Sequence, residues 1–150
     1  PICSIEEIYD ICRDRFVGWS KLYDYASFLE DQNDYTNAIE VAENLRWYYS
    51  APGRKVDEYD LGRLYNLLGM LYHLQNRSEK AEKYYLVAIG IRERLVEKNA
   101  AAYEPYLAIS CFLFSLNSKN ETYLIKAYEI AKRRQDDPRC KTIVEFVESH

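Results

Sequence analysis

Apolar side chains recur every three to four residues along most of this chain, which is the spacing of one face of an α-helix. Gly and Pro number only 5 and 4 in 150 residues, and no stretch alternates apolar and polar residues long enough to predict a strand. We therefore expect an all-α fold of about eight helices. The pattern places them over about 4–17, 19–31, 35–49, 57–74, 79–97, 103–116, 121–134 and 138–149.

Several helix ends carry local signals. Ser4 and Glu7 form a capping box at the start of the first helix. Ser78 stands where an N-cap is expected, directly after the Asn76-Arg77 turn. Pro138 suits the first turn of the last helix, because that turn does not need its backbone N–H. The clearest loop in the chain is residues 50–53, which contain Pro and Gly.

A spacing of small and large residues occurs three times along the chain. In its central copy the gaps are 3, 1, 3, 9, 4 and 3 residues, and they select Tyr65, Leu68, Gly69, Tyr72, Ala81, Tyr85 and Ala88. The same gaps, 43 residues upstream, select Leu22, Tyr25, Ala26, Leu29, Ala38, Ala42 and Leu45. Another 42 residues downstream of the centre they select Leu107, Ser110, Cys111, Phe114, Tyr123, Ala127 and Ile130.

This spacing resembles the tetratricopeptide repeat, a pair of antiparallel helices with small residues where the two helices come closest. The resemblance implies one domain over 1–150, built as a right-handed superhelical stack. It would consist of an N-terminal helix (4–17), repeats over 19–50, 57–98 and 103–135, and a C-terminal capping helix (138–149). The period of 42–43 residues exceeds the usual 34 and is similar to that of kinesin light chain and of bacterial repeat proteins.

The three copies match the family pattern to different degrees. The small residue of the first helix is Ala26, Gly69 or Cys111. The third copy departs from the pattern, because Ser110 replaces a large apolar residue and Tyr123 replaces Ala. We therefore describe the third repeat as degenerate.

In this family the first helix of each pair lines a concave groove that binds a peptide or a partner protein. The corresponding positions include Leu74 and Leu116, and among them we take as candidate partner-binding residues Tyr23, Ser27, Arg63, Asn66, Met70, His73 and Phe112. Asn66 is suited to holding a peptide backbone amide, and Met70 and Phe112 offer adaptable apolar contact.

Composition narrows the function classes. The net charge of −4 and the isoelectric point of about 5.3 oppose nucleic-acid binding, which needs clustered positive charge. The basic runs Arg92–Arg94 and Lys132–Arg134 fall late in predicted helices and are expected to be solvated helix ends. No apolar run reaches the length of a membrane span and no signal peptide is visible, so we expect a cytoplasmic protein that binds no membrane.

Candidate chemistry is sparse. The four cysteines, Cys3, Cys12, Cys111 and Cys140, lack the spacing of a metal knuckle and are expected to be reduced thiols. The chain shows no catalytic triad motif and no glycine-rich phosphate loop. We therefore expect no enzyme activity, no catalytic residues, no metal and no cofactor.

Two alternative functions stay open at this stage. The apolar stripes at residues 5–16 and 143–147 permit self-assembly of the chain into a homo-oligomer through its terminal helices. The chain also fits the sensor half of a peptide-responsive bacterial regulator, whose effector or DNA-binding domain would lie elsewhere.

Overall fold

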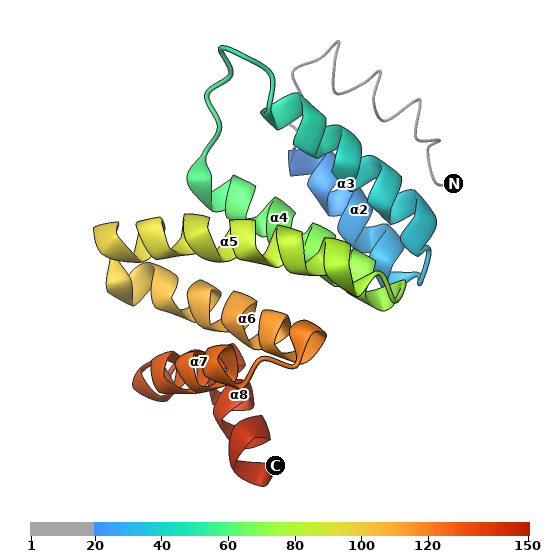
Figure 1. The fold of residues 1–150 in the computed structure, drawn as a ribbon. Coiled ribbons are helices and arrows are strands. Elements are labelled where there is room, and N and C mark those ends of the chain that lie inside the picture. Colours follow the sequence, from blue (N-terminus) through green and yellow to red (C-terminus); the bar gives the residue numbers. More distant parts are fainter. Residues whose placement is uncertain (1–19) are drawn as a thin grey trace. The chain divides into compact units, whose positions relative to one another are not determined.

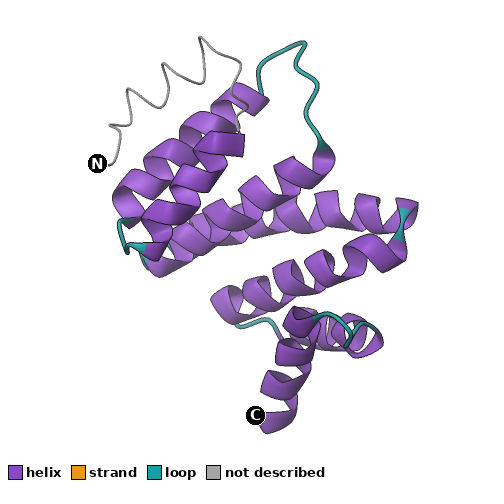
Figure 2. Ribbon diagram, turned by 180° about the vertical axis from the view of Figure 1, so that it is seen from behind, coloured by secondary structure: helices purple, strands orange, loops and turns teal. Residues whose placement is uncertain are grey.

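The computed structural model describes residues 20–150, and every regular element in this part is a helix (Figures 1 and 2). The all-α prediction is therefore confirmed for these residues, and each helix lies within three residues of its expected ends. The helix expected over 4–17 lies outside the described residues. The helices are α2 (Ser20–Asp31), α3 (Tyr35–Tyr49), α4 (Glu58–Leu74), α5 (Ser78–Lys98), α6 (Ala100–Ser118), α7 (Glu121–Arg133) and α8 (Pro138–Ser149).

The helices pack in chain order within two compact units, which divide after Val56. In the first unit α2 packs against α3. In the second unit each helix from α4 to α8 packs against the next, and α6 also contacts α4 and α8. Contact between helices two places apart is what a stack of helix pairs requires, with α4 and α6 as the first helices of successive pairs.

Short polar side chains start most of these helices. Asp34, Asp57, Asn99, Asn120 and Asp137 each precede a helix and accept a hydrogen bond from a backbone N–H of its first turn. Such caps satisfy donors that have no partner inside the helix, which is why the helices begin where these residues stand.

Helix α5 begins differently from the prediction. Ser78 is its first helical residue and not its N-cap, because Arg77 occupies the cap position and makes no side-chain cap bond. The preceding Asn76 has a φ of 60°, a left-handed conformation that Asn tolerates and that turns the chain sharply after α4. The left-handed backbone of Asn76 therefore makes the turn, and α5 begins two residues later at Ser78.

A close helix contact in the second unit joins Gly69 of α4 to Tyr85 of α5. A Cβ atom built on Gly69 would lie 2.6 Å from the Tyr85 ring, closer than carbon atoms can approach. Tyr85 itself is 1% exposed. This is the position at which the repeat pattern requires a small residue, and the other small residues, Ala26, Ala81 and Cys111, are fully buried.

The two departures in the third copy have structural explanations. Ser110 is fully buried, where its hydroxyl group hydrogen-bonds to side chains of α4 and α5. Tyr123 packs its ring edge-on to Phe114, with ring centroids 4.7 Å apart. A polar contact and an aromatic contact therefore take the places that an aliphatic residue and an alanine usually fill.

The expectation of solvated helix ends is wrong for Arg92. This residue is only 5% exposed, and it donates hydrogen bonds to the Tyr106 carbonyl at 3.0 Å and to the Ser110 hydroxyl at 2.7 Å. Arg133 and Arg134 are more exposed, and both bind the carboxylate of Glu104 at 2.8 Å. Arg92 therefore links α5 to α6, and Arg133 and Arg134 link the end of α7 to α6. These partners are distant in sequence and come close only in the folded chain.

Candidate partner-binding surface

Helices α4 and α6 meet along a seam of polar and aromatic pairs. Tyr59 lies beside Tyr103 with ring centroids 6.5 Å apart. Two turns further along, the Ser110 hydroxyl donates to Asn66 Oδ1 at 2.8 Å. The two helices therefore run side by side in the same direction.

A third pair closes the seam at the helix ends. His73 Nδ1 lies 2.8 Å from Asn117 Oδ1, while Asn117 Nδ2 donates to the Ser78 carbonyl at 3.0 Å. Because the Asn117 oxygen can only accept, His73 carries its hydrogen on Nδ1 in this arrangement. The hydrogen-bonded pairs Asn66–Ser110 and His73–Asn117 are each separated by 44 residues in sequence, so the register is constant along the seam.

The central pair of the seam belongs to a buried chain of hydrogen bonds. Arg92 of α5 donates to Ser110 of α6, and Ser110 donates in turn to Asn66 of α4. Asn66 and Arg92 are 8% and 5% exposed, and Ser110 is fully buried. Removing any one of these groups would leave a buried partner with fewer hydrogen bonds, which is costly away from water. The chain of bonds therefore fixes three helices relative to one another.

The seam leaves two short apolar rows beside it. One row is Met70 and Leu74 on α4, and the other is Phe112 and Leu116 on α6. Residues four apart on a helix lie on the same face, so each row projects from one side of its helix. Leu74 is 44% and Leu116 43% exposed, and Met70 and Phe112 are half-buried. We call these four residues the apolar rows.

The apolar row on α4 and the apolar row on α6 lie next to each other at the ends of these two helices. Leu74 directly follows His73, and Leu116 directly precedes Asn117, and the His73–Asn117 contact joins these two helix ends. Helix α8 borders the row on α6, because the Phe146 ring packs edge-on against Phe112 with centroids 5.1 Å apart. The surface thus combines exposed apolar side chains with a rigid backbone beneath them.

The opposite end of the seam is polar and aromatic. The Tyr59 hydroxyl donates to the Tyr106 hydroxyl at 3.4 Å, and the guanidinium of Arg139 lies 4.6 Å from the Tyr106 ring centre. The hydrogen bond from Tyr59, supported by Arg139, lowers the pKa of Tyr106, and the same bond raises the pKa of Tyr59. The surface therefore has a polar end where the helices begin and an apolar end where they finish.

The predicted partner-binding residues lie on three helices. Tyr23 and Ser27 are half-buried on α2, in the first unit. Arg63 is half-buried on α4 and forms an ion pair with Asp60 at 3.7 Å.

Four of the predicted residues come together in the second unit. Met70 and Phe112 belong to the apolar rows, and Asn66 and His73 belong to the seam beneath them. Asn66 already uses its carbonyl oxygen for Ser110, and its amide nitrogen lies 3.7 Å from the Met70 sulfur. The sequence analysis did not select Arg92 or Asn117 as site residues. For Asn117 the available signal is its spacing of 44 residues from His73, and for Arg92 it is the polar Ser110 on the next helix.

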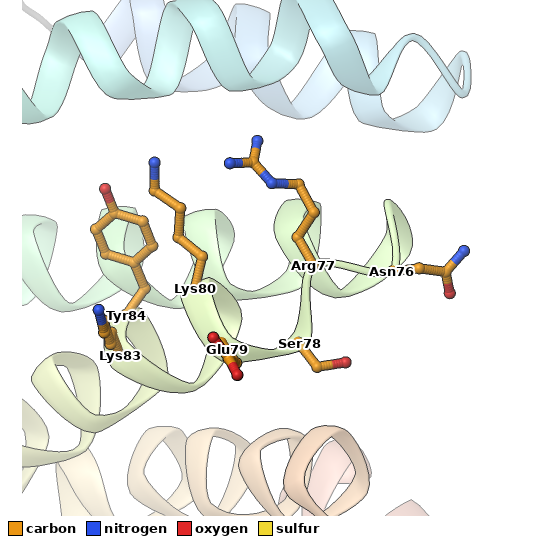
Figure 3. A pocket seen from close by; sticks show the side chains of 7 residues that line it. All are labelled: Asn76, Arg77, Ser78, Glu79, Lys80, Lys83 and Tyr84. Atoms are coloured by element: carbon orange, nitrogen blue, oxygen red, sulfur yellow. The ribbon is translucent and has the colours of Figure 1, made fainter.

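The structure also has a surface hollow at the start of α5 (Figure 3). Arg77, Lys80 and Tyr84 point to the same side of it. Arg77 and Lys80 both lie over the Tyr72 ring, at 4.8 and 4.9 Å from its centre. All the side chains that line the hollow are exposed or half-buried, so we assign it no function. They are Asn76, Arg77, Ser78, Glu79, Lys80, Lys83 and Tyr84.

The described cysteines are buried thiols. Cys111 and Cys140 are both free and fully buried. Burial raises the pKa of Cys111 to about 12 and that of Cys140 to about 11, so neither is an activated nucleophile at neutral pH. Within residues 20–150 no group of three or more His, Cys, Asp or Glu side chains is placed to hold a metal ion. In the same range, none of the helices is both long and apolar enough to span a membrane.

A comparison with protein-family models matches residues 62–94 to the tetratricopeptide repeat. The matched segment contains most of α4 and α5, including the contact between Gly69 and Tyr85. No curated protein and no solved structure matches the chain significantly.

Proposed function

We propose that the chain is an interaction module that binds a peptide or a segment of a partner protein across α4 and α6. Residues 62–94 match the tetratricopeptide repeat, a helical repeat that is typically non-catalytic and mediates protein–protein contacts. The observation that carries this proposal is the pair of apolar rows, exposed on two helices that buried hydrogen bonds hold in register.

The dimensions of the rows suit a short apolar segment. Each row presents two side chains one helical turn apart, which is the spacing of apolar anchors on a bound amphipathic helix. Met70 is flexible and polarizable, so it adapts to different partners. Phe112 supplies a large contact area, and its ring is held by Phe146 before any partner arrives. A surface that is ordered in advance loses less entropy on binding.

The remaining predicted residues take different roles in this proposal. Asn66 acts as a positioning residue, because its carbonyl oxygen is committed to Ser110. His73 positions the helix ends through Asn117, while its exposed ring edge borders the rows. Arg63 contributes charge at the polar end of the surface. Tyr23 and Ser27 lie on α2 in the first unit and stay predicted contact residues outside this surface.

Self-assembly through the C-terminal helix has less support. The side chains of α8 that face away from the core are polar, as expected of the last helix of a stack in contact with water. They include Lys141, Thr142, Glu145 and Glu148, all exposed. The apolar residues Cys140, Ile143 and Val144 are buried within the chain, and Val147, the last residue of the predicted stripe, is half-buried.

The proposal can be tested with peptides selected from a random 15-residue display library on the wild-type chain. The double variant Leu74→Asp/Leu116→Asp should bind the selected peptides more weakly by roughly tenfold or more for each substituted position. The reason is that each substitution places a charge where the apolar rows contact the peptide. Ile125→Asp is the matched control, since Ile125 is an aliphatic residue on α7 that is 55% exposed. Equal binding to all three proteins, or a library that yields no binder, would contradict the proposal.

A further inference from the structure

Gly90 lies near the middle of the 21-residue helix α5, where glycine costs about 1 kcal/mol relative to alanine. Packing explains two other helical glycines, because a Cβ on Gly69 would meet Tyr85 at 2.6 Å and one on Gly62 would touch Arg92 and Ile91 at 3.4 Å. At Gly90 a Cβ would meet nothing within 4 Å. The interior of the chain therefore gives no reason for glycine at this position.

The residues that share a face with Gly90 are exposed and partly apolar. Leu86 is 41% and Val87 43% exposed, and both lie one turn before Gly90. Arg94 lies one turn after it, and its guanidinium binds Glu58 at 3.2 Å and donates to the Gly90 carbonyl at 3.3 Å. The guanidinium therefore lies beside the Gly90 backbone, while the place of a Cβ on Gly90 stays open. The face thus has an open notch, with apolar side chains on one side of it.

Two opposite charges flank this notch at equal distance. Lys83 stands seven residues before Gly90 and Glu97 seven residues after it, so both lie on the same helix face as Gly90. Both side chains are exposed, and neither forms an ion pair within residues 20–150. The face is therefore basic at one end, open in the middle and acidic at the other.

We propose that two copies of this chain associate through this face, with their α5 helices antiparallel and crossing at Gly90. A two-fold axis passes through that crossing. A residue that stands a given number of positions before Gly90 in one copy therefore faces the residue that stands the same number of positions after Gly90 in the other copy. Lys83 then meets Glu97 of the second copy, and the symmetry repeats this pair. Leu86 packs on the aliphatic part of Arg94 in the second copy, and the paired glycines allow the backbones to come close.

The same charges favour this orientation over the alternative. In a parallel pair Lys83 would face Lys83 and Glu97 would face Glu97, and like charges in contact are repulsive. One helix face buries less area than a standard protein interface, so the dimer should be weak and concentration-dependent. It leaves the apolar rows on α4 and α6 uncovered, and peptide binding there is therefore independent of it.

Sedimentation equilibrium on the full chain, at concentrations up to about 1 mM where weak interfaces become populated, tests the proposal. The wild type should form dimers. Lys83→Glu and Glu97→Lys should each weaken dimerisation by tenfold or more, because each places like charges opposite one another. The double variant Lys83→Glu/Glu97→Lys should recover wild-type association, since it restores both pairs in reversed order.

Gly90→Leu provides a second variant that fills the notch without changing charge. It should abolish dimerisation while its circular dichroism and melting temperature show a folded helical chain. A wild type that stays monomeric throughout the range would overturn the proposal. So would a dimer that Gly90→Leu leaves intact, which would place the interface on another surface, or a double variant that does not recover.

Discussion

The two seams formed by α6, one with α4 and one with α8, are built from different chemistry. Against α4, α6 uses the hydrogen-bonded pairs Asn66–Ser110 and His73–Asn117, with tyrosine rings in contact where the two helices begin. Against α8, it uses the ring contact between Phe112 and Phe146 and the contact of the Arg139 guanidinium with the Tyr106 ring. Hydrogen bonds require particular partners in one register, whereas an edge-on aromatic pair tolerates small shifts.

The difference indicates a division of roles along the second unit. The polar seam fixes α4 and α6 so that the apolar rows project beside it, and a slip of α6 by one residue would separate every donor from its acceptor. The aromatic seam closes the end of the row on α6 and holds the Phe112 ring. The following predictions are ordered from the largest expected effect to the smallest.

Gly69→Leu should destabilise the chain most, by about 3 kcal/mol or more, because the new side chain overlaps the Tyr85 ring and forces the backbones of α4 and α5 apart. Urea unfolding followed by circular dichroism measures the effect. Gly90→Ala is the control at a concentration where the chain is monomeric, and it should raise stability by up to about 1 kcal/mol. Equal effects of the two substitutions would contradict the repeat packing described above.

Ser110→Ala tests the polar seam. It should cost about 1–3 kcal/mol in the free energy of unfolding, because the buried side chains of Asn66 and Arg92 both lose a hydrogen-bond partner. Ser118→Ala, also on α6, removes an exposed bond to Glu82 and a 3.3 Å bond from the Asn117 amide, which keeps its bond to the Ser78 carbonyl. It should therefore change stability by less than about 0.5 kcal/mol. If the two serine variants unfold alike, the seam does not stabilise the fold.

Phe146→Leu tests the aromatic seam and keeps most of its apolar area. It should cost about 1 kcal/mol, the usual worth of an aromatic pair beyond its buried area. Native-state hydrogen exchange should quicken in α8 and remain slow in α4 and α5. A loss larger than that of Ser110→Ala would reverse the proposed order of the two seams.

The carboxylate of Glu104 gives a smaller, pH-dependent effect at the start of α6. Burial acts to raise its pKa, but the hydrogen bonds from Arg133 and Arg134 outweigh burial and lower the pKa below the ordinary value of 4.5. A depressed pKa in the folded state means that the stabilisation is present above pH 4.5 and is lost as the pH falls through the folded-state pKa. The wild type should therefore lose more stability than Glu104→Gln between pH 6 and pH 3 in urea titrations, and identical pH profiles would contradict this.

The helices and the central repeat could be predicted from the sequence, because the residue patterns that indicate them lie within one helix or one helix pair. Apolar spacing and small residues such as Gly69 reflect contacts within one helix pair, so they recur at fixed distances along the chain. Ser110 looked like a departure from the pattern because its partners, Asn66 and Arg92, lie on two other helices. Arg92 was misjudged for the same reason, since a cation late in a helix usually faces water.

The candidate site was predictable to a similar extent. The family register selected Met70 and Phe112 as candidate partner-binding residues, and with them the positions of Leu74 and Leu116, and their role in binding stays a prediction. It did not show that Asn66 is occupied by Ser110 or that Phe146 covers part of Phe112, because side-chain pairing between helices depends on the packed fold.

The most direct test of binding across α4 and α6 uses Met70, the chain's single methionine. Labelling its methyl group with ¹³C gives one nuclear magnetic resonance signal from the apolar rows, and labelled isoleucines report on Ile125 of α7 as a reference. Addition of a peptide selected on the wild type should shift or broaden the Met70 signal and leave that of Ile125 unchanged. A bound peptide that leaves the Met70 signal unmoved would contradict the proposal and place the binding surface elsewhere on the chain.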